Sequence, residues 1–443
     1  MVLKDNSKYS VTTDNLNDVL LLQNIANRNI SELADEYDNS ILIYPYSFKE
    51  CEDRLGKQQL ILLQATWNGN KCTKANLETG NVAGFIGING LSVSIHSRFS
   101  RNTDEDFFLH YMLQKVLNIN VVSLQHGIKD EQVFDFLLYL FPKLLNDALT
   151  QGLYKEYQRN EYNDANVRGV IDINRHIKRN MPFNGRIAYR TREFSHDNNV
   201  TELIRHTIEY ICTTKFGKAL LECNAETRSN VAQILAATTR YNRQDREKVI
   251  KNNLKIANHP FYTRYAPLQK LCLRILKHEK IKYGQKENKI HGILFDVSYL
   301  WEEYLATILT RQGFKHPDNR KGIGRIHLTN TNKFPRYLDF YREHDSIVID
   351  AKYKAETEKR DDIHQIITYM YRLKGKYGIL IHPTCQKHTI KRHPLLGYGE
   401  HNSAELHTYL FNVPQDANDY NDFIAKIRLS EDLLIKDLGD KTK

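Results

Sequence analysis

The sequence predicts an α+β protein of several domains: a β-rich and helical N-terminal region, a helical middle part, and a C-terminal α/β core around a mixed central sheet. Three observations predict this class. The chain has 443 residues, which is too long for one ordinary core. Its apolar periodicity changes from strand-like to helical and then to a mixture of the two. With 41% hydrophobic and 26% charged residues, the chain has enough apolar material to fold.

The first domain is expected to span residues 1–160. Residues 1–100 alternate short apolar runs with turn signals, a pattern that is typical of strands. The clearest runs are 40–46, 60–67 and 84–95, and the last of them turns at Asn89-Gly90. From Asp104 to about Tyr157 the apolar residues recur at helical spacing, which predicts two helices.

The second domain, residues 161–285, is expected to be a basic connector followed by helices. The connector runs from about Asn163 to His196 and is predicted to be rich in loops. Asp197 or Asn198 then caps a helix with a buried apolar face. That face consists of Leu203, Ile204, Ile208 and Ile211. Further helical patterns lie near 228–240 and 266–278.

The third domain is expected to span residues 286–443, after the polar stretch 282–289. Its pattern predicts a helix, three strands, a second helix and a fourth strand. These elements are expected near 294–310, 323–329, 335–341, 346–353, 361–373 and 377–383. This order indicates a compact mixed sheet flanked by helices.

The balance of charges favours a polyanionic partner such as nucleic acid. The formal net charge is +10 and the pI is about 9.0, although an excess of Lys also occurs in plain soluble proteins. Between Lys315 and Arg336 the basic residues outnumber a single acid, Asp318. We expect five of these basic residues to contact DNA: Arg320, Lys321, Arg325, Lys333 and Arg336.

Several classes of protein are disfavoured by missing patterns. The sequence has no apolar run of 18 residues and no apolar segment near Met1 that is typical of a signal peptide, so we expect a cytoplasmic protein without a membrane partner. Its six Cys form no C-x-x-C pair, which argues against a zinc ribbon and a disulfide framework. No phosphate-binding G-x-x-x-x-G-K-[ST] motif occurs, so the chain is not expected to hydrolyse nucleotides itself.

The segment YLDFYREHDSIVIDAKYK, Tyr337–Lys354, predicts a hairpin with the chemistry of phosphodiester hydrolysis. Residues two apart in a strand share a face, so Asp350 and Lys352 point the same way, and pairing across the turn brings Asp339 beside them. Carboxylates are hard ligands for Mg²⁺, which activates water and neutralises charge on the phosphate. A nearby ammonium group can orient the water. We therefore predict Asp339, Asp350 and Lys352 as catalytic residues.

The D-x-K tripeptide by itself is a weak signal, and a surface strand end with a salt bridge would look the same. Its context favours a site, because two carboxylates lie on adjacent strands and an apolar strand leads into the motif. Glu302 or Glu303, on the preceding helix, is expected to complete the metal shell with Asp339 and Asp350. Gln365 and Tyr369 are spaced to face the site from the following helix. For these helix residues, ordinary solvent exposure remains the alternative.

These residues resemble the PD-(D/E)xK nuclease superfamily, with Asp in place of Glu. More specifically, the chain resembles the McrC family. The resemblance rests on the segments Asn166–Ile211, Leu294–Leu305 and Ile349–Lys354, the last followed by the Gln365 helix. The family's aromatic-Glu pair matches Trp301-Glu302, which favours Glu302 over Glu303.

The resemblance implies a partner, an McrB-like AAA+ GTPase whose hexameric ring binds the N-terminal part of the nuclease subunit. GTP would be bound by that partner, which would recognise DNA carrying modified cytosine. The present chain would stimulate GTP hydrolysis and cut double-stranded DNA with Mg²⁺, as the subunit of a type IV-like restriction endonuclease in phage defence. Two alternatives remain open: a catalytically silent GTPase-activating adaptor, and a RecB-like or transposase-type nuclease.

Overall fold

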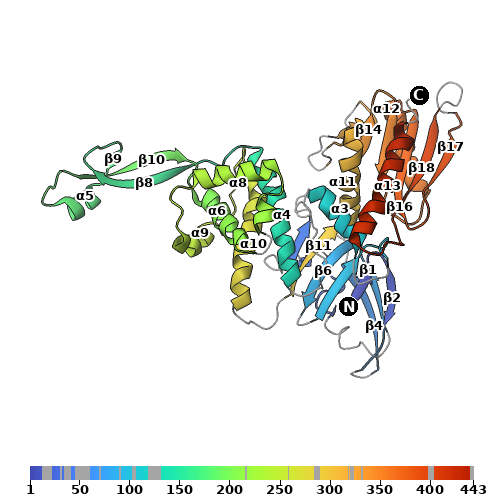
Figure 1. Ribbon diagram of the computed structural model, residues 1–443, viewed down its shortest axis with the longest axis horizontal. Helices are drawn as coiled ribbons and strands as arrows, with labels where there is room; N and C mark the ends of the chain where they lie inside the picture. The colour runs from blue at the N-terminus through green and yellow to red at the C-terminus, as the bar shows by residue number, and fades with distance from the viewer. Residues whose placement is uncertain are drawn as a thin grey trace. The chain divides into compact units, whose positions relative to one another are not determined.

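The chain folds into two compact units. The computed structural model describes residues 1–11, 22–29, 32–33, 41–44, 60–68, 71–88, 91–101, 106–117, 131–214, 217–257, 259–283, 290–317, 319, 324–330, 333–397 and 404–439. Unit 1 combines Met1–Val121 with Glu287–Lys443, and unit 2 is Val122–Lys286 (Figure 1). This grouping differs from the three consecutive domains of the sequence analysis, because it joins both ends of the chain in one unit.

A five-stranded sheet joins the two segments of unit 1. Its order is β1 (Val2–Lys4), β7 (Leu91–His96), β6 (Val82–Ile88), β11 (Ile290–Asp296) and β3 (Ile41–Tyr44). Strand β11 pairs antiparallel with β6 and parallel with β3. Leu294 of β11 is buried in the core of this sheet. An apolar strand from the C-terminal segment thus completes the N-terminal sheet.

This strand corrects the expected helix at 294–310. Residues Ile290–Asp296 are strand, and helix α11 spans Val297–Leu309. The helix begins there because the side chain of Asp296 accepts hydrogen bonds from the backbone N–H groups of Ser298 and Tyr299. The apolar face predicted for this helix is buried, including Trp301 and Tyr304.

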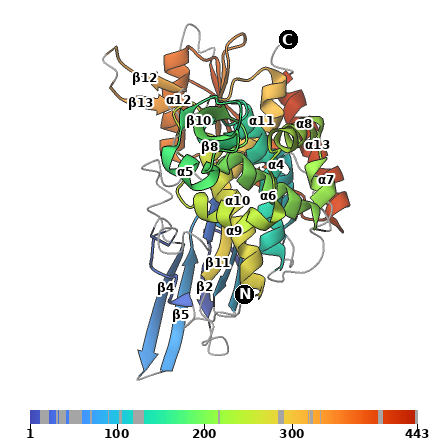
Figure 2. The same cartoon turned by 90° about the vertical axis from the view of Figure 1, so that its left-hand side faces the viewer.

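A second, antiparallel sheet of the N-terminal segment has the order β2 (Lys8–Val11), β5 (Lys71–Thr79) and β4 (Ile61–Asn68), and Figure 2 shows β4 and β5 as a long ribbon. The strands expected at 40–46, 60–67 and 84–95 are confirmed as β3, β4 and the pair β6 and β7. The expected turn at Asn89-Gly90 lies outside the described residues.

Helices also connect the two segments of unit 1. Helix α3 (Phe107–Leu117) packs against α11 and against α13 (Tyr420–Gly439). The hydroxyls of Tyr111 and Tyr304 both donate to Oε1 of Glu431, at 2.9 Å and 2.8 Å. Because Glu431 is buried, these bonds satisfy a carboxylate that would otherwise destabilise the interior.

The C-terminal segment of unit 1 contains a mixed sheet, as the sequence predicts. Its order is β14 (Phe340–Arg342), β15 (Ile347–Ala351), β16 (Tyr377–Thr384), β18 (Glu405–Asn412) and β17 (Thr389–Pro394). The three inner strands are parallel, and the two edge strands are antiparallel to their neighbours. Helix α12 (Arg360–Leu373) packs on β15 and β16. The sequence analysis did not predict β17, β18 or α13.

Unit 2 has a helical body. It contains α4 (Glu131–Leu149), α6 (Asn199–Cys212), α7 (Gly217–Leu221), α8 (Ala225–Ala237), α9 (Arg246–Asn252) and α10 (Tyr265–Tyr283). Asn198 caps α6, and the four apolar residues predicted for its inner face are buried. Helix α4, which the sequence analysis assigned to the first domain, packs on α10 and α8 of this body. Among the helices that the structure describes, none has the length and apolarity needed to cross a membrane.

The expected loop-rich connector is instead a β-arm that extends from the helices of unit 2 (Figure 1). Strands β8 (Glu156–Asp164) and β10 (Ile187–Ser195) pair antiparallel over their whole length, and they flank β9 (Val170–Ile171) and α5 (Ile173–Asn180). The strands carry polar residues on both faces, so the apolar alternation that signals a strand is missing. Cross-strand contacts stabilise the arm instead, such as the stacked rings of Tyr162 and Tyr189.

Candidate active site

The predicted hairpin is present and brings Asp339 beside Asp350 and Lys352. Strands β14 and β15 pair antiparallel, with Phe340 opposite Ile349. Asp339 lies one residue before β14, and its Oδ2 accepts a hydrogen bond of 2.8 Å from the backbone N–H of Ala351. This bond fixes the Asp339 carboxylate at the end of β15.

Asp350 and Lys352 form a buried ion pair. Asp350 is 1% exposed, and its Oδ2 lies 2.6 Å from Nζ of Lys352. The backbone N–H of Lys352 donates to the carbonyl of Ile381, which continues the pairing with β16 past the end of β15. The two side chains therefore share one face of an extended segment, as the strand period predicts.

Helix α12 contributes a chain of hydrogen bonds to the site. Nζ of Lys352 donates to Oε1 of Gln365 at 3.0 Å, and Nε2 of Gln365 donates to the hydroxyl of Tyr369 at 2.6 Å. That hydroxyl donates in turn to the carbonyl of Tyr337, also at 2.6 Å. Gln365 and Tyr369 thus lie where their spacing predicts, and they connect Lys352 to the backbone that precedes Asp339.

Asp362 is a neighbour of the site that the sequence analysis missed. Its buried carboxylate lies 3.7 Å from Nζ of Lys352 and accepts a 2.8 Å hydrogen bond from Nζ of Lys354. The signal for it was available, because Asp362 lies three residues before Gln365 and so shares a helix face with it.

Two further residues adjoin the site: Glu302 on α11, and His316, which the sequence analysis had not singled out. Nε2 of His316 lies 3.5 Å from Oε1 of Glu303, and its Nδ1 lies 3.9 Å from Oε1 of Glu302. The same Nδ1 is 2.8 Å from the carbonyl of Asp339, and the ring stacks on Phe340. No motif spacing marks His316, because its partners come from distant segments of the chain.

The carboxylates of the site repel one another in a place with little water. Burial, followed by the charges of Glu302 and Asp350, raises the pKa of Asp339 well above its ordinary range. Burial also raises the pKa of Asp350, against the opposing charge of Lys352. Burial lowers the pKa of Lys352, but the charge and hydrogen bond of Asp350 outweigh it and the pKa is raised. The cluster therefore favours binding a proton or another positive charge.

The three predicted metal ligands, Asp339, Asp350 and Glu302, are not grouped as a metal-binding site in this structure. Within the described part of the chain, no three His, Cys, Asp or Glu side chains are grouped closely enough to hold a metal ion. The ammonium of Lys352 lies 2.6 Å from Oδ2 of Asp350 and so occupies one side of that carboxylate.

The predicted DNA-contacting stretch includes a small two-stranded ribbon, β12 (Arg325–His327) and β13 (Pro335–Tyr337), which Figure 2 shows beside α12. Arg325 and Lys333 are exposed, and Arg336 is partly exposed. Two aromatic side chains are exposed with them, Phe334 and Tyr337. Arg320 and Lys321 lie outside the described residues.

Comparison with known proteins assigns the family. A family model described as "McrBC 5-methylcytosine restriction system component" matches residues 77–383, which is more than half of the chain. The chain belongs to this family. The resemblance to McrC that the sequence suggested is thereby confirmed. The family match includes the segments of Glu302, Asp339, Lys352 and Gln365, and the β-arm of unit 2.

Two solved structures are similar to this McrBC-family chain. One is a refined half-complex of Thermococcus gammatolerans McrB AAA+ hexamers with bound McrC, at 12% identity and a TM-score of 0.48, covering 97% of this chain and 99% of that chain. The other is the McrBC complex of the same organism, at 13% identity and a TM-score of 0.33, covering 72% and 89%. No curated protein sequence matches the chain.

Proposed function

We propose that this McrBC-family chain is the nuclease subunit of a GTP-dependent restriction complex directed to modified cytosine. It cuts double-stranded DNA with Mg²⁺ in a PD-(D/E)xK-type site formed by Asp339, Asp350 and Lys352. It also binds and stimulates an McrB-like AAA+ GTPase ring, which holds the GTP. The observation that carries the proposal is the convergence of these three residues at the end of one buried strand, inside a chain of this family.

Asp339 and Asp350 supply two oxygen ligands of the kind that Mg²⁺ prefers. Asp339 and Asp350 are held close together by the β14–β15 pairing. Burial raises the pKa of both; the charges of Glu302 and Asp350 also raise that of Asp339, and the charge of Asp362 also raises that of Asp350. A divalent cation held by Asp339 and Asp350 would offset this negative charge, and Glu302 is the further carboxylate whose charge acts most strongly on Asp339. When bound, Mg²⁺ supplies an activated water and neutralises charge on the scissile phosphate.

The chain's own residues then have separate roles. Lys352 carries a proton at neutral pH, because its pKa is raised, so its ammonium can orient water and stabilise negative charge on the phosphate. Gln365 holds that ammonium through a 3.0 Å hydrogen bond. Tyr369 fixes Gln365, because its hydroxyl accepts from the amide and donates to the carbonyl of Tyr337. Lys352 is thereby positioned before DNA arrives.

The DNA and the protein partner would meet different surfaces. The β12–β13 ribbon offers exposed cations, Arg325 and Lys333, beside exposed aromatic rings, which suits a nucleic acid. The β-arm offers large apolar side chains to solvent, which is typical of a protein-binding surface. Those on and around α5 are Val170, Ile171, Ile173, Ile177, Met181 and Phe183, each between 47% and 76% exposed. We assign this surface to the GTPase partner, in place of the N-terminal part of the chain that the resemblance to McrC implied.

Plasmid cleavage tests the proposal. The purified chain is assayed with Mg²⁺ on modified and unmodified DNA, with and without an McrB-like GTPase and GTP, as wild type and as Asp350→Asn. We expect cleavage only in the complete wild-type mixture, and a loss of at least about 10³-fold in Asp350→Asn, because the variant loses a ligand charge. GTPase stimulation should survive in this variant.

The matched control is Asp345→Asn. Asp345 lies in the turn of the same hairpin and is ion-paired with Arg342, away from the site, with 12% of its side chain exposed. This control should keep cleavage at any temperature where it is folded. If wild type stimulates GTP hydrolysis but cuts neither DNA, the nuclease proposal fails and the chain is a GTPase-activating adaptor.

A further inference from the structure

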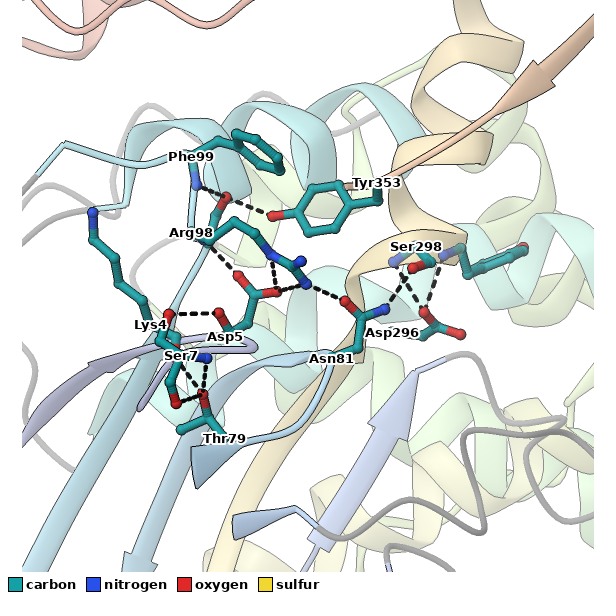
Figure 3. Close-up of polar contacts among 12 residues, drawn as sticks. Lys4, Asp5, Ser7, Thr79, Asn81, Arg98, Phe99, Asp296, Ser298 and Tyr353 are labelled. Atoms are coloured by element: carbon teal, nitrogen blue, oxygen red, sulfur yellow. Dashed lines mark hydrogen bonds and ion pairs between the residues drawn. The ribbon is translucent and has the colours of Figure 1, made fainter. Parts of the chain in front are cut away.

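A buried polar network connects the N-terminal sheet to the active-site strand at Tyr353 (Figure 3). Tyr353 directly follows Lys352, and it is 3% exposed. Its hydroxyl shares a 2.6 Å hydrogen bond with Oγ of Ser97, which is fully buried just after β7. The residue next to Lys352 is therefore held by the N-terminal segment of unit 1.

The ring of Tyr353 is held as well as its hydroxyl. The guanidinium of Arg98 lies 5.0 Å from the ring centroid, within the range of a cation–π contact. The ring of Phe99 meets it edge-on, with centroids 5.0 Å apart. The Tyr353 side chain is thus contacted by three consecutive residues, Ser97, Arg98 and Phe99. These contacts restrict the movement of the adjacent Lys352.

Arg98 is itself fixed by a buried carboxylate. Asp5 is fully buried; its Oδ2 accepts a 2.8 Å hydrogen bond from Nε of Arg98, and its Oδ1 accepts one of 2.5 Å from the backbone N–H. Replacing such a buried ion pair with well-packed apolar residues is often neutral or stabilising, so stability alone gives little reason for it. Its directional bonds instead define where the guanidinium lies.

A second branch leads from Arg98 to the helix that bears Glu302. Nη2 of Arg98 donates to Oδ1 of Asn81, and Nδ2 of Asn81 donates to Oγ of Ser298 at 2.5 Å. Ser298 lies in the first turn of α11, where its backbone N–H is bound by Asp296. Figure 3 shows this path from Arg98 through Asn81 to the start of the helix. One arginine therefore contacts Tyr353 directly and is connected to α11 through Asn81.

We propose that Arg98 and Tyr353 form a positioning clamp, through which the N-terminal sheet holds Lys352 and the Glu302 helix in alignment for cleavage. The clamp rests on the proposed nuclease function. It gives the N-terminal segment a role in the reaction without any contact to DNA. Neither Arg98 nor Tyr353 is a catalytic residue in this assignment, because each acts through its neighbours.

Tyr353→Phe is the sharpest test, because it removes the bond to Ser97 and keeps the ring under Arg98. Tyr420→Phe is the matched control: Tyr420 is also buried in unit 1, and its hydroxyl donates one 2.7 Å hydrogen bond, to Gln114 on α3. Both variants lose one buried hydroxyl, so their unfolding temperatures should fall by similar amounts. In the complete complex we expect Tyr353→Phe to lower kcat on the order of tenfold with KM for DNA unchanged. Tyr420→Phe should keep the wild-type kcat.

Hydrogen exchange gives a readout that does not depend on cleavage. In the full chain, Tyr353→Phe should speed amide exchange in peptides covering Ile347–Lys354 and Val297–Leu309, and Tyr420→Phe should leave these peptides unchanged. Ser97→Ala removes the same bond from its other end, together with the 3.1 Å hydrogen bond that the Phe99 backbone N–H donates to Oγ of Ser97. The double variant Ser97→Ala/Tyr353→Phe should therefore lower kcat by less than the two single effects combined, because both substitutions break the same bond.

The outcomes separate the clamp from the function on which it rests. If wild type fails to cut DNA, the proposed function is wrong, and hydrogen exchange still decides whether the clamp aligns the two elements. If wild type cuts and Tyr353→Phe matches Tyr420→Phe in kcat and in exchange, the clamp is overturned. Additive effects of Ser97→Ala and Tyr353→Phe would also contradict it.

Discussion

The two units of the chain differ in their balance of acidic and basic residues. Unit 1 contains 35 Lys and Arg against 36 Asp and Glu, whereas unit 2 contains 28 against 17, so the positive surplus of the whole chain lies in unit 2. Unit 1 buries charged groups and satisfies them internally, as Asp5, Asp350 and Glu431 show. The net charge that suggested a nucleic-acid partner therefore does not come from the unit that holds the candidate active site.

The units also differ in how they treat apolar surface. In the described part of unit 1, apolar side chains pack in one core at the N-terminal sheets and in another at the C-terminal mixed sheet. Unit 1 also exposes some apolar side chains, such as Leu396 and Phe334, but unit 2 groups large ones on its arm, such as Ile173 and Phe183, beside basic residues. Under the proposed function, this contrast assigns cleavage and partner binding to different units, because an internally paired unit suits a reaction site and an exposed apolar arm suits a partner.

The largest effect that tests this difference between the units is expected from substitutions on the β-arm. Ile173→Ser/Ile177→Ser removes two apolar side chains that are 66% and 53% exposed, so we expect GTPase stimulation to fall by about 10- to 100-fold. The unfolding temperature should not change, because neither side chain is buried. The control is Leu396→Ser in unit 1, at 87% exposure, which should leave stimulation intact. Equal effects of both variants would abolish the distinction between the units.

A smaller effect is expected from salt. We expect Arg325→Glu/Lys333→Glu to reduce cutting by about tenfold at 50 mM salt, and this difference from wild type should shrink as salt rises to 200 mM, because a protein with fewer phosphate contacts releases fewer counterions. The contrast is Lys178→Glu/Arg179→Glu, at two exposed positions of α5 in the basic unit. If the second pair changes the salt profile of cutting and the first does not, the DNA-contacting surface belongs to unit 2.

The smallest effect concerns stability in acid. Burial, followed by the charge of Arg246, lowers the pKa of His206 in unit 2 to about 4. As the pH falls below about 6.5, His206 binds a proton in the unfolded chain but not in the folded chain. The free energy of unfolding therefore decreases between pH 7 and pH 4. His206→Gln should reduce the difference in unfolding free energy between pH 7 and pH 5 by about 1–2 kcal/mol. An unchanged difference would mean that His206 is protonated in the fold.

Much of the candidate site could be predicted because its residues are close in sequence. Asp350 and Lys352 share a face through the strand period, and Asp339 reaches them through a short turn. The i, i+4 spacing placed Gln365 and Tyr369 on one helix face, where the structure has them. His316 escaped prediction, since its contacts with Glu303 and Asp339 depend on packing between separate elements.

The fold was predictable where apolar residues mark one face of an element. Helix α6 was predicted with its cap and its buried face, because its apolar residues repeat at helical spacing. The β-arm was mistaken for loops, because its stability comes from cross-strand pairing of polar strands rather than from burial. The helix expected at 294–310 was wrong at its start, because Ile290–Asp296 pairs with β6, a strand some 200 residues earlier.

By itself, the sequence determined the local chemistry of this protein: the acid, acid and lysine of the candidate site, the strand that presents them, and the resemblance to McrC. These follow from periodicities and spacings that act over a few residues. Only the tertiary structure decided that both ends of the chain form one unit, and that Arg98 contacts both the active-site strand and the Asn81 path to α11. Those contacts depend on long-range strand pairing and burial, which no local pattern encodes.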